Sequence, residues 1–107
     1  MSVNLVVSDN IAQHLTKLAS QERGDIDRVL NILLETEYRR RLMRYRLIDQ
    51  QMQQKYNMDF ATFEEQQIVK QLEFSWPVES DAISWETAID GIQTVQHRLE
   101  ALHHEAH

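Results

Sequence analysis

The sequence has no cysteine, one proline and two glycines among its 107 residues. Without cysteine the chain cannot form a disulfide framework, a cysteine-ligated metal centre or a thiol nucleophile, and this suits a reducing cytoplasm. Sandwiches, barrels and dinucleotide-binding units are disfavoured as well, because they need glycine at tight turns and phosphate loops. We therefore expect a mainly α-helical protein.

Long apolar runs are also missing. No segment reaches the roughly 18 consecutive apolar residues of a membrane span, and the first seven residues do not have the basic and apolar regions of a signal peptide. We expect a soluble, cytoplasmic chain with no membrane partner.

The net charge of −6 is unevenly distributed along the sequence. Residues 1–46 carry eight Lys and Arg against six acids, a balance of +2, whereas residues 47–107 carry three against eleven, a balance of −8. This difference predicts a basic head over 1–46 and an acidic helical extension over 47–107 that faces a basic protein. The alternative is that both charge runs are solvated helix faces.

One short segment has the pattern of a β-strand. Val3, Leu5 and Val7 alternate with Ser2, Asn4 and Val6, and β-branched residues favour strands. A single strand leaves its backbone groups unpaired, so the pattern predicts an intermolecular ribbon with a second copy, and hence a homodimer.

Capping residues indicate two helices after this segment. Ser8 or Asp9 can cap the first, Gly24 lies at its end or in the following turn, and Asp25 can cap the second. Since neither glycine nor proline occurs between Asp25 and Pro77, the second helix is expected to continue for about 32 residues. Its apolar residues recur at helical spacing and form one stripe along the helix: Leu34, Tyr38, Leu42, Tyr45, Ile48, Met52 and Tyr56.

The remainder reads as two further helices. Asn57 can end the long helix, and Asp59 can cap a shorter one that carries Phe60, Phe63, Ile68 and Leu72. The segment 74–78 is expected to be extended because of Pro77, and a last helix is expected from about Asp81. Its apolar positions form a heptad seam, which requires another helix against it: Trp85, Ala88, Ile92, Val95, Leu99 and Leu102. The seam does not say whether that helix belongs to this chain, its twin or a partner.

The conspicuous arginine cluster lies on the long helix. Its members are Arg39, Arg40, Arg41, Arg44 and Arg46. Helical spacing predicts ion pairs of Glu35 with Arg39, Glu37 with Arg41 and Arg46 with Asp49. This leaves Arg40 and Arg44 without a local partner.

The order of strand, capped helix, turn at Arg23 and Gly24, and second helix resembles the ribbon-helix-helix fold of small bacterial repressors and antitoxins, over about the first 45 residues. The resemblance implies a dimeric ribbon in the DNA major groove, with Ser2, Asn4 and Val6 facing the bases. We expect phosphate contacts from Lys17, Arg23 and Arg28. The alternative is a ribbon used only for dimerisation.

This resemblance further implies a type II antitoxin without catalytic activity or cofactor. Its head would bind operator DNA and repress transcription, while its acidic extension would bind and neutralise a toxin protein. The residues expected to contact the toxin are Trp76, Glu79, Asp81, Trp85, Ile92, Val95 and Leu99. For the two tryptophans, the alternative is a place in a helical core.

Two other functions stay open. One is a homodimeric helical scaffold that does not bind DNA. The other is a ribonuclease, because Arg98 and His103 resemble the Arg–His motif of the all-helical HEPN family. The spacing of His103 and His107 also permits metal ligation, but we expect no metal site so close to the chain end.

Overall fold

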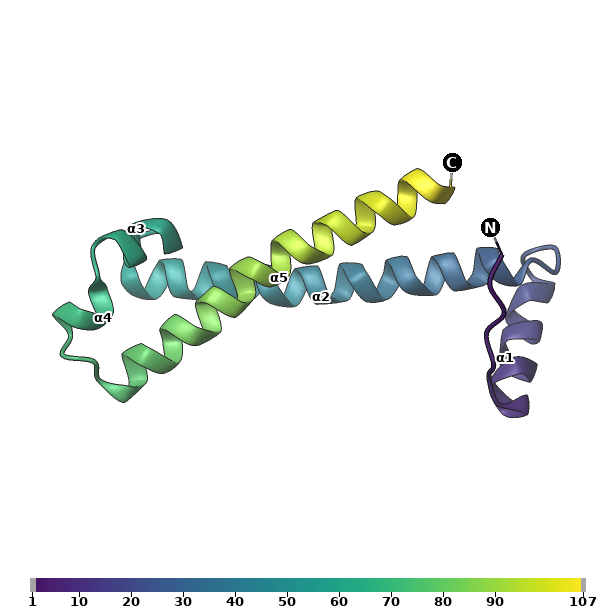
Figure 1. Cartoon of the computed structure of the whole chain (residues 1–107), viewed down its shortest axis with the longest axis horizontal. Helices are drawn as coiled ribbons and strands as arrows, with labels where there is room; N and C mark the ends of the chain where they lie inside the picture. Colours follow the sequence, from purple (N-terminus) through teal and green to yellow (C-terminus); the bar gives the residue numbers. More distant parts are fainter. Residues whose placement is uncertain (1, 107) are drawn as a thin grey trace. The chain divides into compact units, whose positions relative to one another are not determined.

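The computed structural model describes residues 2–106, with side chains as far as His104. This part of the chain is mainly α-helical, as predicted, and contains no strand (Figure 1). None of its helices is long and apolar enough to cross a bilayer. Its helices are α1 (Asp9–Ser20), α2 (Ile26–Tyr56), α3 (Phe60–Glu65), α4 (Ile68–Gln71) and α5 (Trp76–Ala106).

The predicted N-terminal strand is wrong. Residues 2–8 have no regular secondary structure, and Val3, Leu5 and Val6 are largely exposed. A strand is stable only when its backbone N–H and C=O groups pair with a neighbouring strand, and no other described segment supplies one. The ribbon of a ribbon-helix-helix fold is therefore not part of this structure.

The predicted helix boundaries in the first half of the chain are confirmed. The Ser8 hydroxyl accepts the Ile11 N–H at 3.2 Å, and the Asp25 carboxylate accepts the Arg28 N–H at 3.1 Å. Gly24, with φ of +75°, lies in the turn between the two helices. The 31-residue helix α2 ends at Tyr56, and Asn57, the next residue, adopts φ of +56°.

The second half differs from the prediction at two points. Asp59 caps α3 as expected, but Gln67 adopts φ of +52°, so the predicted single helix is divided into α3 and α4. The prediction that residues 74–78 are extended is also wrong, because Phe74 adopts φ of +53° and α5 begins at Trp76. Pro77 lies in the first turn of α5, where a missing N–H costs no helical hydrogen bond.

The described chain divides into two compact units. Unit 1 is Met1–Thr36 and unit 2 is Glu37–His107, so α2 contributes residues to both. Unit 1 contains three Lys and Arg and five acids, a balance of −2. The positive balance of residues 1–46 therefore comes from the arginine cluster, which belongs to unit 2.

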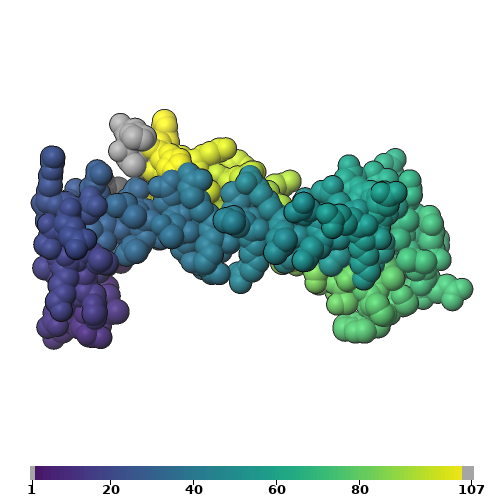
Figure 2. Space-filling view, turned by 180° about the vertical axis from the view of Figure 1, so that it is seen from behind, coloured from purple at the N-terminus to yellow at the C-terminus, as the bar shows by residue number. Residues whose placement is uncertain are grey.

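Unit 2 is a helical hairpin in which α5 returns antiparallel to α2, with α3 and α4 at the connection (Figure 1). In the space-filling view, the teal α3–α4 segment packs against the green start of α5 (Figure 2). One core cluster joins Leu42 to Val95 and Leu99 between the two long helices. A second, at the connection, is built around Phe63, Ile68 and Trp85.

Candidate interaction surfaces

The tryptophan of the heptad seam is a core residue of unit 2. Trp85 has no exposed surface, and its ring lies 5.0 Å from that of Phe63 and 5.3 Å from that of Phe60. Its indole N–H donates to the carboxylate of Asp49 on α2 at 2.8 Å. Burying the ring therefore leaves no unpaired donor.

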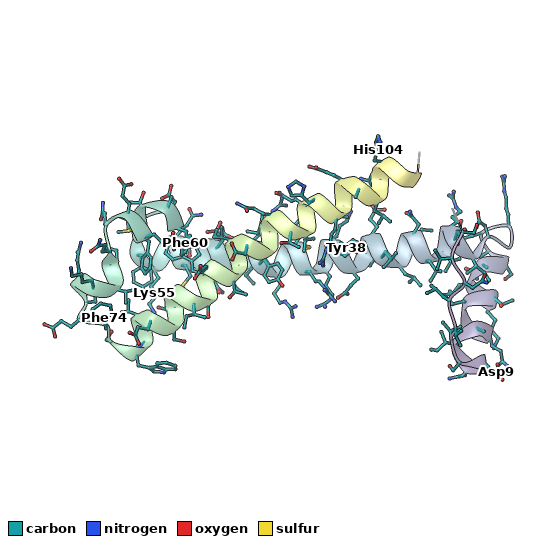
Figure 3. The ribbon with its side chains drawn as sticks, viewed as in Figure 1. Asp9, Tyr38, Lys55, Phe60, Phe74 and His104 are labelled. Atoms are coloured by element: carbon teal, nitrogen blue, oxygen red, sulfur yellow. The ribbon has the colours of Figure 1, made fainter. Side chains whose placement is uncertain are left out.

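A second polar contact joins the helices next to this core. Asp81 on α5 accepts hydrogen bonds from the Lys55 ammonium and the Tyr56 hydroxyl of α2, both at 2.6 Å. Burial alone would raise the pKa of Asp81, but the two donors together hold it below its usual value. Burial, followed by the hydrogen bond to Asp81, raises the pKa of Tyr56 to about 12. Figure 3 labels Lys55 and Phe60 at the connection of the hairpin, and Tyr38 closer to the start of α2.

Most of the residues expected to bind the toxin belong to the core of unit 2. Val95 and Leu99 are buried against Leu42, and Ile92 packs on the same cluster. The helix that covers the seam is thus α2 of the same chain. Together with Trp85, these residues present no free apolar face to a partner.

The first turns of α5 do present a free apolar face to a partner. Trp76 is 72% exposed, and Ile83 on the same helix is 61% exposed. Phe74, just before α5, is 59% exposed, and Glu79 is half-buried. Exposed tryptophan is typical of interaction hot spots. We call Phe74, Trp76 and Ile83 the corner surface.

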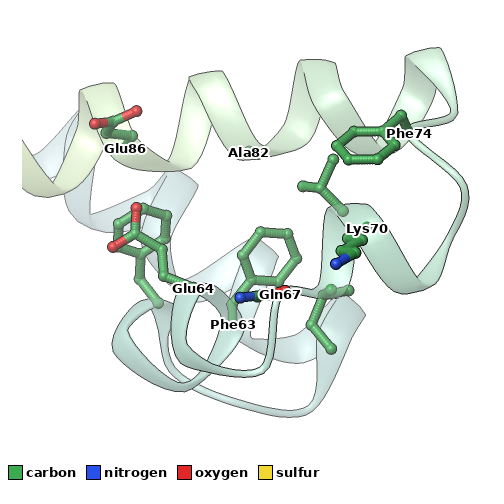
Figure 4. Close-up of a pocket in the computed structure, with 10 residues that line it drawn as sticks. Phe63, Glu64, Gln67, Lys70, Phe74, Ala82 and Glu86 are labelled. Carbon is green, nitrogen blue, oxygen red and sulfur yellow. The ribbon is translucent and has the colours of Figure 1, made fainter.

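Beside the corner surface lies a pocket that sequence reasoning missed. It has a volume of about 380 Å³ and lies between the α3–α4 segment and α5 (Figure 4). Its lining consists of Phe60, Phe63, Glu64, Gln67, Ile68, Val69, Lys70, Phe74, Ala82 and Glu86. The pocket depends on the bend at Gln67, whose left-handed backbone no composition signal indicated. We call it the corner pocket.

Two arginines of the cluster, Arg40 and Arg41, pair with a glutamate of their own helix. Glu37 accepts from Arg40 at 2.7 Å and, as predicted, from Arg41 at 2.9 Å. Hydrogen bonds from these two guanidinium groups lower the pKa of Glu37 to about 2. Arg40 therefore has the local partner that its spacing did not predict.

The predicted pair of Arg46 and Asp49 is absent. Asp49 instead accepts the indole N–H of Trp85 and the side-chain amide of Gln53. Arg44 and Arg46 are exposed and lie beside the exposed side chains of Met43 and Leu47.

Unit 1 has the largest set of exposed apolar side chains. Of its described residues, 2–36, only Ala19 and Val29 are buried. Ten large apolar side chains are between 42% and 99% exposed: Val3, Leu5, Val6, Val7, Ile11, Leu18, Ile26, Ile32, Leu33 and Leu34. We call these ten residues the head surface.

The residues expected to contact DNA are distributed over the segment before α1, α1, the following turn and the start of α2. Ser2, Asn4 and Val6 are exposed in the irregular segment before α1. Lys17 and Arg23 are exposed as well. The Arg28 guanidinium pairs with Glu22 at 2.7 Å, while its backbone N–H is held by the Asp25 cap.

Two of the three C-terminal histidines have described side chains. His103 is half-buried and His104 is exposed, while His107 lies outside the described residues. No group of three potential metal ligands occurs among the residues described. Arg98, the other member of the ribonuclease motif, is exposed on α5.

Comparison of the chain with models of protein families, with curated proteins and with solved structures gives no match.

Proposed function

We propose that this chain is a binding protein of the antitoxin type, which assembles into a homodimer through unit 1 and neutralises a toxin protein by direct binding through unit 2. The observation that carries the proposal is the head surface. A 36-residue unit whose described residues include two buried side chains and ten exposed large apolar ones has too small a core to be stable in isolation.

A second copy is the occupant that best fits the head surface. Both α1 and the start of α2 contribute to this surface, so a twofold contact would let the same apolar side chains cover each other. Homodimer interfaces are the most apolar class of protein interface. The small net charge of unit 1, −2, adds little repulsion between two copies.

Unit 2 is the part that we assign to the toxin. Its hairpin is internally packed and cross-linked by the contacts of Asp49 and Asp81, which makes it a preorganised support for exposed side chains. The corner surface offers an exposed tryptophan within a strongly acidic stretch. Residues 57–90 contain eight carboxylates and a single cation, Lys70, a balance of −7. A basic toxin surface is the complementary partner.

Operator binding has less support from the geometry than toxin binding. The acids Asp25 and Asp27 occupy the start of α2, where a phosphate would have to approach, and Arg28 is paired with Glu22. Unit 1 as a whole is negatively charged. We therefore assign recognition of a protein, and not of DNA, as the main function.

Co-expression with the product of the neighbouring gene tests the function, since antitoxins are usually encoded beside their toxins. We expect the two proteins to co-purify and growth to be restored. Trp76→Ala should weaken the complex by about tenfold or more, as the loss of an anchor residue does. Thr94→Ala, at an exposed site on the same helix, is the matched control and should leave binding unchanged. A toxic neighbour that neither binds the chain nor is neutralised by it would refute the proposal.

A further inference from the structure

The corner pocket has the size and the walls of a ligand site. Its volume of about 380 Å³ falls within the ~300–1,000 Å³ range of sites for small organic groups. Phe63 and Ile68 in its lining are buried, and Phe60 and Phe74 add aromatic surface. An occupant would therefore meet an apolar interior.

The acidic and basic side chains that line the pocket lie on different sides of it. In Figure 4, Glu64 of α3 and Glu86 of α5 lie on one side of the pocket, whereas Lys70 and Phe74 lie on the other and Phe63 lies between. Among the described residues, neither Glu64 nor Glu86 has a side-chain hydrogen bond or ion pair. Two exposed carboxylates beside aromatic rings thus stay available to a ligand.

We propose that the corner pocket receives an arginine side chain of the toxin. A planar guanidinium can stack on a phenylalanine ring and donate hydrogen bonds to two carboxylates at once. Its apolar stem would lie against the buried side chains of Phe63 and Ile68. The net charge of −7 over residues 57–90 favours a cationic occupant over an anionic one.

The pocket and the corner surface would act together. Phe74 belongs to both, and Trp76 follows it by two residues. The arginine would supply charge and orientation, while Trp76 and Ile83 would contact apolar groups around it. This inference rests on the proposed function, because it names where in unit 2 the toxin is recognised.

Titration of the isotope-labelled full-length protein with acetyl-Leu-Arg-Leu-amide tests the pocket without the toxin. The matched probe contains citrulline, which keeps the shape of arginine but carries no charge. We expect NMR shifts at backbone amides of α3, α4 and residues 82–86, with affinity in the millimolar range and at least fivefold weaker for the citrulline peptide. The indole signal of Trp85, which packs against Phe60 and Phe63, should respond as well.

Two sets of variants locate the binding. The double variant Glu64→Gln and Glu86→Gln, at exposed side chains, should reduce arginine-peptide affinity to the citrulline level. The control Glu100→Gln, on the exposed part of α5, should bind as the unaltered chain does. Equal affinity for both peptides, shifts that lie elsewhere, or an unaltered double variant would each overturn the inference.

A second copy of the chain is the competing occupant, since its own Arg44 and Arg46 are exposed. Pocket signals that move with protein concentration in the absence of peptide would identify that occupant and overturn the inference.

The same double variant separates this inference from the proposed function. Undiminished binding and neutralisation of the co-expressed toxin would refute the arginine site and leave the antitoxin function standing. Pocket binding of the peptide by a chain that binds no neighbouring gene product would refute the antitoxin function.

Discussion

Trp85 of α5 and Asp49 of α2, 36 residues apart in sequence, are joined by a 2.8 Å hydrogen bond from the indole N–H to a carboxylate oxygen. The ring is fully buried, so this acceptor is required for the hairpin to close without an unpaired polar group. The rigid support for the corner surface depends on that closure.

Removing this acceptor should destabilise unit 2. Asp49→Ala leaves the buried indole N–H unsatisfied, which costs about 1–3 kcal/mol of unfolding free energy. Asp49→Asn retains a carbonyl acceptor and should cost less. Urea denaturation, followed by far-ultraviolet circular dichroism, measures both. The exposed Asp90→Ala serves as control, and a loss as large there as in Asp49→Ala would argue against a specific role for the bond.

The crossing of α2 and α5 depends on a glycine. A Cβ atom at Gly91 would lie 2.5 Å from Cε2 of the Tyr45 ring. Gly→Ala within a helix ordinarily stabilises by about 1 kcal/mol, but here overpacking of about 1–3 kcal/mol opposes that gain. We expect Gly91→Ala to lower the thermal midpoint.

Removing the tyrosine ring should reverse the effect of that substitution. In a Tyr45→Ala background, Gly91→Ala has room for its methyl group and should stabilise the protein by up to about 1 kcal/mol. A double-mutant cycle in urea measures this change of sign. Additive effects of the two substitutions would show that the ring and the glycine do not meet.

The contact of Asp81 with Lys55 and Tyr56 predicts a loss of stability in acid. The folded pKa of Asp81 lies below its ordinary value of 3.8, so the stabilisation is fully present above that value. It is lost as the pH falls through the folded pKa. Asp81→Asn should remove this pH-dependent stabilisation. The urea midpoints of the variant at about pH 6 and about pH 3 should therefore differ less than those of the unaltered chain. Identical acid sensitivity of the two proteins would contradict the assignment.

Tyr56 predicts a corresponding loss at high pH. Its pKa is raised from 10.0 to about 12, so the stabilisation is present below pH 10 and disappears as the pH rises toward 12. Absorbance of tyrosinate should show one group that ionises near pH 12 and is missing in Tyr56→Phe. Ionisation of Tyr56 at its ordinary pKa would contradict the hydrogen bond to Asp81.

The sequence predicted the features that depend on local chemistry. Capping side chains and left-handed residues correctly located Ser8, Asp25, Asn57 and Asp59, because these signals act within a few residues. The period of the α5 seam correctly predicted a facing helix. The chain reverses direction at α3 and α4, and this reversal makes α2 of the same chain the facing helix. The periodicity of α5 gave no information about that reversal.

The features that failed depend on partners far away in sequence. The alternation at Val3–Val7 is compatible with a strand, but a strand also needs a neighbour, and none is present among residues 2–106. Asp49 was expected to pair with Arg46 on its own helix and instead accepts from Trp85 across the hairpin. Periodicity also could not locate the corner pocket, because its lining depends on the fold at Gln67.

The central claim is that the head surface holds two copies of this chain together. Sedimentation equilibrium of the full-length protein at micromolar concentration measures this most directly. We expect a mass of twice the 12.7 kDa of one chain, and dissociation or unfolding in the variant Ile32→Asp and Leu33→Asp. The exposed Met43→Asp, in unit 2, should remain dimeric. A stable 12.7 kDa monomer with folded α1 would contradict the account.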